Sequence, residues 1–313
     1  MSRTAESATA AWVAADPQSQ QLFALLRRVA QTPTTVLIRG ESGTGKDLLA
    51  QLLHLLGPNA AEPTVKIDCA SLPPELLESE LFGYERGAFT GAERVKPGRL
   101  ELAGRGTLIL DEVAALGLPL QAKLLRVLEE RKFERLGGHS AIAIEARLVA
   151  LTNADLERAV AAHSFREDLF YRLNVLPLRI PPLRERRGDI EPLAERFLQL
   201  LAEVHRRAAP RLSAAARRRL FAYDFPGNAR ELRNLLERAM IQCGGEEIGE
   251  ADLPPQVART GAEEAEKTLE QVEKEYIAAA LERHRGRKSE TARALGISRK
   301  TLLEKRKRYQ LDA

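Results

Sequence analysis

The sequence contains few cysteines and lacks any long apolar run. Only Cys69 and Cys243 occur among its 313 residues, which excludes a disulfide scaffold and indicates a reducing compartment, the cytoplasm. No uninterrupted apolar stretch approaches the roughly 18 residues of a membrane-spanning helix, so no membrane partner is expected. The Ala-rich stretch after Arg3 is too short and too polar for a secretory signal. The five histidines lie far apart, and none pairs with a cysteine at zinc-ligand spacing.

Short apolar runs mark the first half of the chain as α/β. They are 36–39, 64–67, 107–110 and 147–151, and helix-length segments separate them. This alternation predicts a parallel sheet with crossover helices. After Pro181-Pro182 the strands are predicted to stop. Apolar residues at three- and four-residue spacing near 189–206, 213–223 and 228–242 then indicate a small helical subdomain.

Charge is segregated at the C-terminal end. The net charge of +4 hides ten acids and three bases in 246–275, followed by eleven bases and two acids in 283–309. The basic segment predicts a helix, a turn and a second helix, with Gly296 at the turn and Ser298 as the N-cap of the second helix. The small core between the two helices is expected to consist of Ala292, Leu295, Ile297 and Leu302. The second helix is expected in the major groove of DNA. Residues nearest the bases are Ser298, Arg299, Lys300 and Thr301, and those facing phosphates include Lys305 and Arg306.

A glycine-rich loop, GESGTGKD, follows the first apolar run at positions 40–47. Strand, glycine-rich loop and helix is the context of a P-loop, in which backbone N–H groups and a helix N-terminus face phosphate oxygens. Lys46 is expected to reach the β- and γ-phosphates, and Asp47 stands where Ser or Thr normally meets magnesium. The predicted ATP-binding residues here are Gly40, Glu41, Ser42, Gly43, Thr44, Gly45, Lys46 and Asp47.

TLILDE at 107–112 supplies a second half of such a site. Two carboxylates at the end of an apolar strand are costly unless a cation or ligand meets them. We expect Asp111 to hold Mg²⁺ together with Asp47, and Glu112 to polarise the attacking water as general base. About sixty residues after a P-loop, this pair predicts nucleotide hydrolysis.

GAFTGA lies between these two motifs and is the most discriminating pattern in the chain. With GESGTGKD, ELFGYERGAFTGA (80–92), GTLILDEV (106–113), FREDLFYRLNVLPLRIPPLRERRGDI (165–190) and FPGNARELRNLLERA (225–239), it resembles the sigma-54-dependent transcriptional activators. These are bacterial enhancer-binding proteins of the AAA+ class, and the resemblance runs from about Pro17 to the end. No regulatory domain is expected ahead of the ATPase.

The resemblance implies a domain order and further site residues. The domains are a leader (1–16), an AAA+ α/β core (17–183), a helical lid (184–245), a linker (246–266) and a Fis-like helix-turn-helix domain (267–313). Arg166 and Arg172 match arginines that reach a neighbouring subunit's γ-phosphate, Thr152 and Asn153 match the sensor beside that phosphate, and Arg230 matches the lid arginine. The residues implied to touch sigma-54 are Gly87, Ala88, Phe89, Thr90, Gly91 and Ala92.

Two positions depart from the family pattern. The family usually carries Glu where this chain has Asp47, a shorter acid. It commonly carries Asn at the position of Asp68, where an amide is thought to restrain the catalytic Glu. An ionised Asp68 cannot donate a hydrogen bond and repels Glu112, so we hypothesise altered coupling between hydrolysis and sigma-54 engagement.

The function expected from these residues is an ATP-hydrolysing activator that binds upstream DNA and remodels the closed complex of sigma-54 RNA polymerase. It is expected to assemble from dimers into a hexameric ring. Two sources of control stay open: a separate regulatory protein acting in trans, or a sensor domain ahead of Met1 if Met1 is not the native start. Two alternatives remain. One is an AAA+ motor acting on another protein, and the other is a DNA-binding regulator with a vestigial ATPase.

Overall fold

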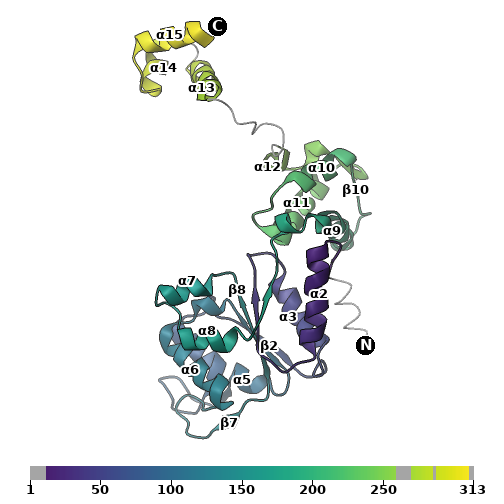
Figure 1. Cartoon of the computed structure of the whole chain (residues 1–313), viewed down its shortest axis with the longest axis vertical. Helices are drawn as coiled ribbons and strands as arrows, with labels where there is room; N and C mark the ends of the chain where they lie inside the picture. The colour runs from purple at the N-terminus through teal and green to yellow at the C-terminus, as the bar shows by residue number, and fades with distance from the viewer. Residues whose placement is uncertain (1–11, 259–268, 285–286, 310–313) are drawn as a thin grey trace. The chain divides into compact units, whose positions relative to one another are not determined.

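A computed structural model describes residues 12–258, 269–284 and 287–309, in two units (Figure 1). The first unit ends at Ala258 and the second begins at Arg259. Most of the expected leader, residues 1–11, and the stretch 259–268 of the expected linker and DNA-binding domain lie outside the described residues. Across the described ranges, no helix combines the length and apolarity needed to cross a lipid bilayer.

A five-stranded parallel sheet forms the centre of the first unit. Its strands are β1 (Val36–Arg39), β2 (Thr64–Asp68), β5 (Thr107–Asp111), β8 (Arg147–Thr152) and β9 (Leu176–Arg179). They lie in the order β2-β5-β8-β1-β9, so the four predicted runs are strands and the α/β class is confirmed. The sequence did not predict β9. Its Pro177 lacks an N–H, which an edge strand paired only with β1 tolerates.

Helices cover both faces of this sheet (Figure 1). Those on one face are α2 (Pro17–Ala30) and α3 (Lys46–Leu55). Those on the other are α4 (Pro74–Phe82), α5 (Arg99–Leu102), α6 (Leu118–Glu130), α7 (Leu156–Ala161) and α8 (Glu167–Leu173). Strand residues alternate between the two cores, since Val36 and Ile38 pack with α3 while Leu37 packs with the opposite cluster. All three side chains are fully buried, which explains why these strands read as continuous apolar runs.

Two short antiparallel pairs extend beyond the sheet. One joins β3 (Gly83–Tyr84) to β4 (Lys96–Pro97), and the other joins β6 (Lys132–Phe133) to β7 (Ile142–Ala143). The first pair brackets the GAFTGA segment. Both pairs are two residues long, too short to leave an alternating pattern in the sequence.

The helical lid follows Pro182. Its helices are α9 (Ile190–Val204), α10 (Ala214–Ala222) and α11 (Asn228–Gln242), close to the predicted segments, preceded by the short turns η2 (Leu183–Glu185) and η3 (Arg187–Asp189). They share one core, in which Leu198, Leu220, Phe225 and Leu236 are buried.

Two expectations for this region are wrong. Strands do not stop at Pro182, because β10 (Arg211–Leu212) pairs in parallel with β11 (Glu247–Ile248). The expected linker also begins too early, since η4 (Glu250–Asp252) and α12 (Pro255–Ala258) belong to the lid. Buried apolar side chains hold this segment on the lid core, namely Ile248, Leu253 and Val257. Acidic and proline-rich composition concealed these three anchors.

The second unit contains α13 (Leu269–Arg283), α14 (Lys288–Ala294) and α15 (Arg299–Tyr309). Its core joins Ile277 and Leu281 of α13 to Ala292 and Leu302, with Leu295 and Ile297 packed beside them, as predicted. Gly296 ends α14 with φ of +67°, a left-handed value that suits glycine. The Ser298 hydroxyl accepts a hydrogen bond from the Thr301 N–H at 3.0 Å, which confirms the predicted N-cap.

Candidate active site

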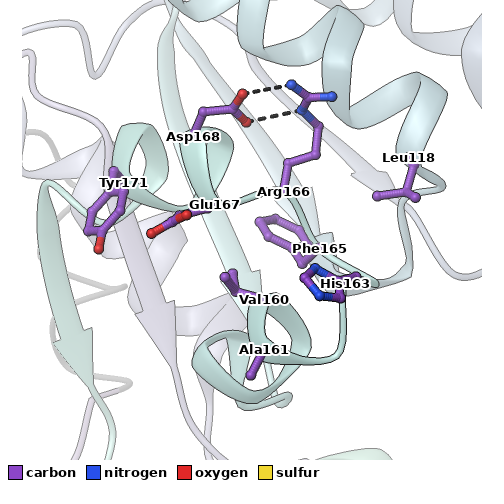
Figure 2. Close-up of a pocket in the computed structure, with 9 residues that line it drawn as sticks. All are labelled: Leu118, Val160, Ala161, His163, Phe165, Arg166, Glu167, Asp168 and Tyr171. Atoms are coloured by element: carbon purple, nitrogen blue, oxygen red, sulfur yellow. Dashed lines mark hydrogen bonds and ion pairs between the residues drawn. The ribbon is translucent and has the colours of Figure 1, made fainter.

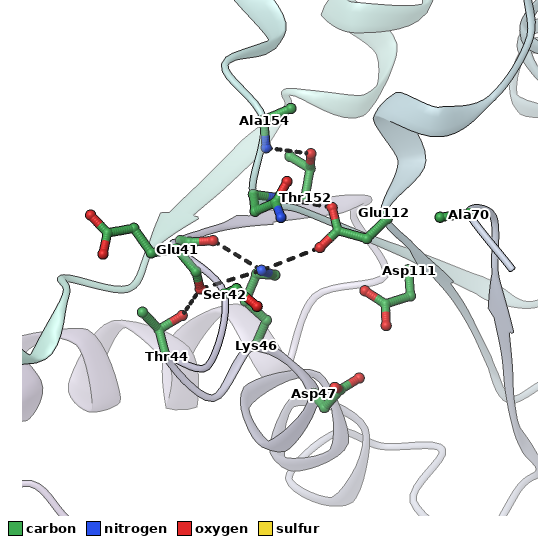
Figure 3. A network of polar contacts seen from close by, with 12 residues as sticks. Glu41, Ser42, Thr44, Lys46, Asp47, Ala70, Asp111, Glu112, Thr152 and Ala154 are labelled. Carbon is green, nitrogen blue, oxygen red and sulfur yellow. Dashed lines mark hydrogen bonds and ion pairs between the residues drawn. The ribbon is translucent and has the colours of Figure 1, made fainter. Parts of the chain in front are cut away.

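The glycine-rich loop connects β1 to α3 and folds over the side chain of Lys46 (Figure 3). Gly43 and Gly45 have φ of +79° and +102°, a region that L side chains rarely enter. Lys46 is 8% exposed, and its Nζ donates to the carbonyl oxygens of Gly40 at 2.9 Å and Glu41 at 3.4 Å. The loop therefore presents a buried ammonium and a helix N-terminus to the same space.

The two carboxylates that end β5 point in different directions. Glu112 has a left-handed backbone (φ +51°), and its Oε1 lies 3.5 Å from Lys46 Nζ. Its Oε2 accepts a hydrogen bond from the Asn153 N–H at 3.1 Å. The hydroxyl of buried Thr152 accepts the Ala154 N–H at 3.0 Å. The structure thus brings Lys46, Glu112 and the backbone N–H of Asn153 together, whereas the Thr152 hydroxyl caps the turn that follows β8 (Figure 3).

Sequence reasoning missed Lys66, which lies in the middle of β2. Its Nζ forms ion pairs with Asp47, on α3, and with Asp111 Oδ2 at 2.7 Å. Burial lowers the pKa of Lys66, but hydrogen bonds from its ammonium to Asp111 and Asp47 outweigh this and raise the pKa above its ordinary value. The carboxylates of Asp47 and Asp111 therefore converge on one cation. This donor set fits Mg²⁺, which takes one or two carboxylates together with phosphate oxygens and water.

Asp68 ends the same strand, directly beside Asp111 in the register of β2 and β5. Its Oδ1 accepts the Ala70 N–H at 2.9 Å and so caps its own turn. The hydrogen bonds that hold Glu112 come from elsewhere, namely from Asn153. Asp68 and Glu112 are expected to lie close together because β2 and β5 are neighbouring strands. Two ionised carboxylates cannot donate a hydrogen bond to each other, and none is found between them among the described residues.

The second residue of the loop, Glu41, faces the lid. Arg184 donates to its two carboxylate oxygens at 2.6 and 2.9 Å, and Asn228 Nδ2 donates to it at 3.1 Å. The Arg184 hydrogen bond, set against a smaller opposing effect of burial, lowers the pKa of Glu41 to about 2. The interaction consequently stabilises the fold above pH 4.5 and is lost as the pH falls toward 2. Arg230 Nη1 also donates to Ser42 Oγ at 2.9 Å, so the lid arginine lies at the P-loop, as expected.

Arg166 and Arg172 lie on or next to α8, away from these contacts. Arg166 makes a bidentate pair with Asp168 at 2.7 and 3.0 Å, and Arg172 donates to the Leu128 carbonyl at 3.0 Å. In the described part of the chain, no hydrogen bond or ion pair links either arginine to Lys46 or Glu112. Arg166 lines an open cavity of about 750 Å³ that Tyr171 and His163 also line (Figure 2).

The GAFTGA segment forms a tight loop between β3 and β4. The Gly87 N–H bonds to the Ala92 carbonyl at 2.8 Å, and the Ala92 N–H bonds to the Phe89 carbonyl at 3.0 Å. Gly87 and Gly91 have φ of +86° and +103°. Phe89 is 47% exposed and rests edge-on against Tyr84, with ring centroids 4.9 Å apart. The loop therefore presents a supported aromatic ring to solvent, as the sequence predicts.

In the DNA-binding unit the predicted contact residues divide into two groups. Arg299 and Lys300 are exposed at the N-terminus of α15, whereas the hydroxyls of Ser298 and Thr301 are hydrogen-bonded to each other at 2.8 Å. Lys305, expected on phosphate, forms an ion pair with Glu273 of α13. The sequence treats the acidic stretch 246–275 and the basic stretch 283–309 as separate segments, so it does not predict the ion pair between Glu273 and Lys305.

The fold and site define a P-loop ATPase domain of the AAA+ class with a helical lid. The structure resembles Hsp104 of S. cerevisiae with a TM-score of 0.52 at 17% identity, over 74% of this chain and 45% of that one, a likeness of fold alone. Much stronger is the likeness to NtrX of Brucella abortus, with a TM-score of 0.77 at 36% identity over 97% of this chain and 70% of that one. A second NtrX structure, solved in complex with ADP, gives 0.75 at 37% identity, covering 95% and 68%.

Family models match nearly the entire described chain. They are the Sigma-54 interaction domain (residues 12–179), the AAA+ ATPase lid domain (184–270) and the Bacterial regulatory protein, Fis family (268–309). The chain belongs to the family of sigma-54-dependent transcription activators, with an AAA+ ATPase domain and a Fis-type DNA-binding domain.

Named relatives agree with this membership. The regulatory protein AtoC of Escherichia coli is 46% identical over 297 residues, which is 91% of this chain and 64% of AtoC. The transcriptional regulatory protein ZraR of E. coli is also 46% identical, over 94% of this chain and 67% of ZraR. The nitrogen fixation protein VnfA of Azotobacter vinelandii is 46% identical over 93% of this chain and 57% of VnfA. This chain thus spans between 57% and 67% of the length of these three relatives.

The contacts of Glu41 give a first prediction about the junction of core and lid. Replacing Glu41 with Gln removes the charge that Arg184 and Asn228 share, so we expect about 1 kcal/mol less stability to urea for this partly exposed pair. Hydrogen exchange should also quicken at the Leu183 N–H, which donates to Asn228 Oδ1 at 2.7 Å.

Glu157→Gln is the matched control, because it weakens a partly exposed ion pair in the α/β core domain, away from the lid. There Arg39 Nη1 donates to both carboxylate oxygens of Glu157. This variant should lower stability by a similar amount without changing exchange at Leu183. Equal exchange rates at Leu183 in Glu41→Gln and the wild type would contradict the role of Glu41 at this junction.

Proposed function

We propose that the chain is an ATP-hydrolysing transcription activator that binds upstream DNA, assembles into a ring and remodels the closed complex of sigma-54 RNA polymerase. The observation that carries this proposal is the convergence of Lys46, Asp111 and Glu112 beside the glycine-rich loop (Figure 3). Family membership supports the same activity. The site lies at the carboxyl end of the parallel strands, where ligands of α/β sheets bind.

Each residue of the site has a distinct part in hydrolysis. Lys46 exchanges its hydrogen bonds with P-loop carbonyls for the β- and γ-phosphates, while Asp47 and Asp111 hold Mg²⁺. A magnesium ion held by these two carboxylates would neutralise charge on the phosphates. Glu112 accepts a proton from the attacking water, and its orientation is set by the Asn153 N–H and by Lys46.

Arg166 and Arg172 act on the nucleotide of a neighbouring protomer. Their present partners, Asp168 and the Leu128 carbonyl, keep them on their own subunit's surface. A cation supplied in trans stabilises charge in the transition state and makes hydrolysis depend on assembly. The contact between protomers is then heterologous, and it closes into a ring, which the family resemblance makes hexameric. The DNA-binding units join the protomers in pairs.

The GAFTGA loop couples hydrolysis to sigma-54. Its half-exposed Phe89 and its Thr90 form the tip, and Tyr84 at its base ties it to β3 and β4. Phe89 leaves about half of its ring in solvent at the tip of a glycine-flanked loop, which supports a role in contacting a partner. The presence of both this loop and a Fis-type DNA-binding unit argues against an AAA+ motor that acts on some other protein. The intact Lys46 and Glu112 argue against a DNA-binding regulator with a vestigial ATPase.

The protein acts in the cytoplasm. The DNA and polymerase partners support this location. Reducing conditions are consistent with the two buried cysteines, Cys69 and Cys243, each of which is unpaired with another sulfur.

Removal of the P-loop ammonium tests the ATPase assignment. Lys46→Ala should lower the rate of ATP hydrolysis by about a hundredfold or more, because a preorganised cation at the phosphates is lost. Phosphate release measures the rate. Lys132→Ala is the control, since Lys132 is an exposed lysine that pairs with Glu130, and it should hydrolyse ATP like the wild type. Unchanged hydrolysis in Lys46→Ala would sink the assignment.

Substitution of Thr90 separates hydrolysis from remodelling. Thr90→Ala should retain ATPase activity but lose open-complex formation at a sigma-54 promoter by about tenfold or more, as for a central interface residue. Permanganate footprinting measures the open complex. Thr64→Ala, at an exposed threonine on β2, should behave as wild type. Normal open-complex formation by Thr90→Ala is the result that contradicts the role of the loop.

Asp68 has its own test. Asp68→Asn keeps the acceptor for the Ala70 N–H and adds an amide donor toward Glu112. We expect a lower basal ATPase rate and a larger stimulation by sigma-54, measured as the ratio of rates with and without sigma-54. Asp155→Asn, which alters a carboxylate that caps α7, should leave the ratio unchanged. Identical stimulation of Asp68→Asn and the wild type refutes altered coupling.

A further inference from the structure

Lys66 is the one ammonium recorded on Asp47 and Asp111 in the described part of the chain. These three residues come from β2, α3 and β5, so only the folded sheet brings them together. The other lysine of the site, Lys46, is occupied by two P-loop carbonyls and by Glu112. The acids of the site are therefore divided between two cations, and Lys66 serves the pair that the proposed function assigns to magnesium.

We propose that Lys66 is a built-in counter-cation that competes with the divalent metal for Asp47 and Asp111. This inference rests on the proposed function, because that function makes these two carboxylates the metal ligands. The carboxylate lone pairs that accept hydrogen bonds from an ammonium are the same lone pairs that a metal ion takes as ligands. A divalent cation on the same oxygens also repels it. Metal loading therefore requires Lys66 to leave both acids.

The side chain of Lys66 can make this movement. It is 41% exposed and carries four rotatable methylene groups, and β2 is the edge strand of the sheet. The ammonium can therefore return to water without opening the core. The consequence is a site whose two carboxylates are partly neutralised without metal and bind metal less tightly than they would without Lys66.

Replacement of Lys66 by Met tests this competition. The full chain is saturated with a non-hydrolysable ATP analogue, and Mn²⁺ binding is followed by electron paramagnetic resonance. Lys66→Met should bind Mn²⁺ about three- to tenfold more tightly than the wild type, the range expected on removal of one partly exposed competing charge. Lys66→Arg keeps a cation in place and should retain the wild-type affinity or a weaker one.

Lys123→Met is the matched control. Lys123 is also a half-exposed lysine on a carboxylate, Glu78, but it belongs to α6 and stands outside the site. Its Mn²⁺ affinity should equal that of the wild type. A second readout is thermal unfolding with EDTA and no nucleotide, where Lys66→Met should lose more stability than Lys123→Met because two facing carboxylates lose their cation.

The outcomes separate this inference from the proposed function. Equal or weaker Mn²⁺ binding by Lys66→Met overturns the competition, even though the wild type binds the metal. If the wild type itself binds no Mn²⁺ with the analogue, the proposed function fails and the competition with it. Should Lys66→Met not fold, Lys66→Gln, which is polar and uncharged, takes its place with the same expected gain in affinity.

Discussion

Carboxylates gathered at one edge of a sheet need cations, and this constraint governs the whole site. Parallel strands end at the same edge of the sheet, so Asp111 and Glu112 at the end of β5 come together with Asp47 at the start of α3. Close carboxylates repel each other unless a positive charge lies between them. Lys46 meets Glu112, and Lys66 meets the remaining pair. Its own two lysines therefore neutralise most of the charge on these three carboxylates before any nucleotide enters the site.

A further carboxylate of the loop, that of Glu41, connects the site to the lid. Glu41 turns its carboxylate away from the phosphate-facing side of the loop, and Arg184 and Asn228 neutralise and hold it there. Asn228 also accepts the Leu183 N–H, with an amide buried at the start of α11. A change in the loop conformation therefore acts directly on the first turn of the lid.

The sequence predicted the elements whose signals lie within a short stretch of chain. Four strands of continuous apolar residues, three lid helices and the P-loop followed from periodicity and turn residues, and the cap at Ser298 followed from one hydroxyl at the right offset. Strand β9 escaped prediction because Pro177 weakens its strand signal, and β10 and β11 because each has two residues. Lys66 escaped for a different reason. Its role depends on the pairing of β2 with β5 and on the packing of α3, and no spacing along the chain encodes that convergence.

The charge of the DNA-binding unit shows the same limit of one-dimensional reading. Residues 283–309 contain eleven bases, which suggests that all of them are available to DNA. In the folded unit, Glu273 of α13 pairs with Lys305 and accepts the Tyr309 hydroxyl, while Glu270 pairs with Arg308. The acids that precede the basic segment thus fix the position of α15. Part of the positive charge therefore holds the unit together, while Arg299 and Lys300 at the start of α15 remain exposed, where we predict contact with the bases.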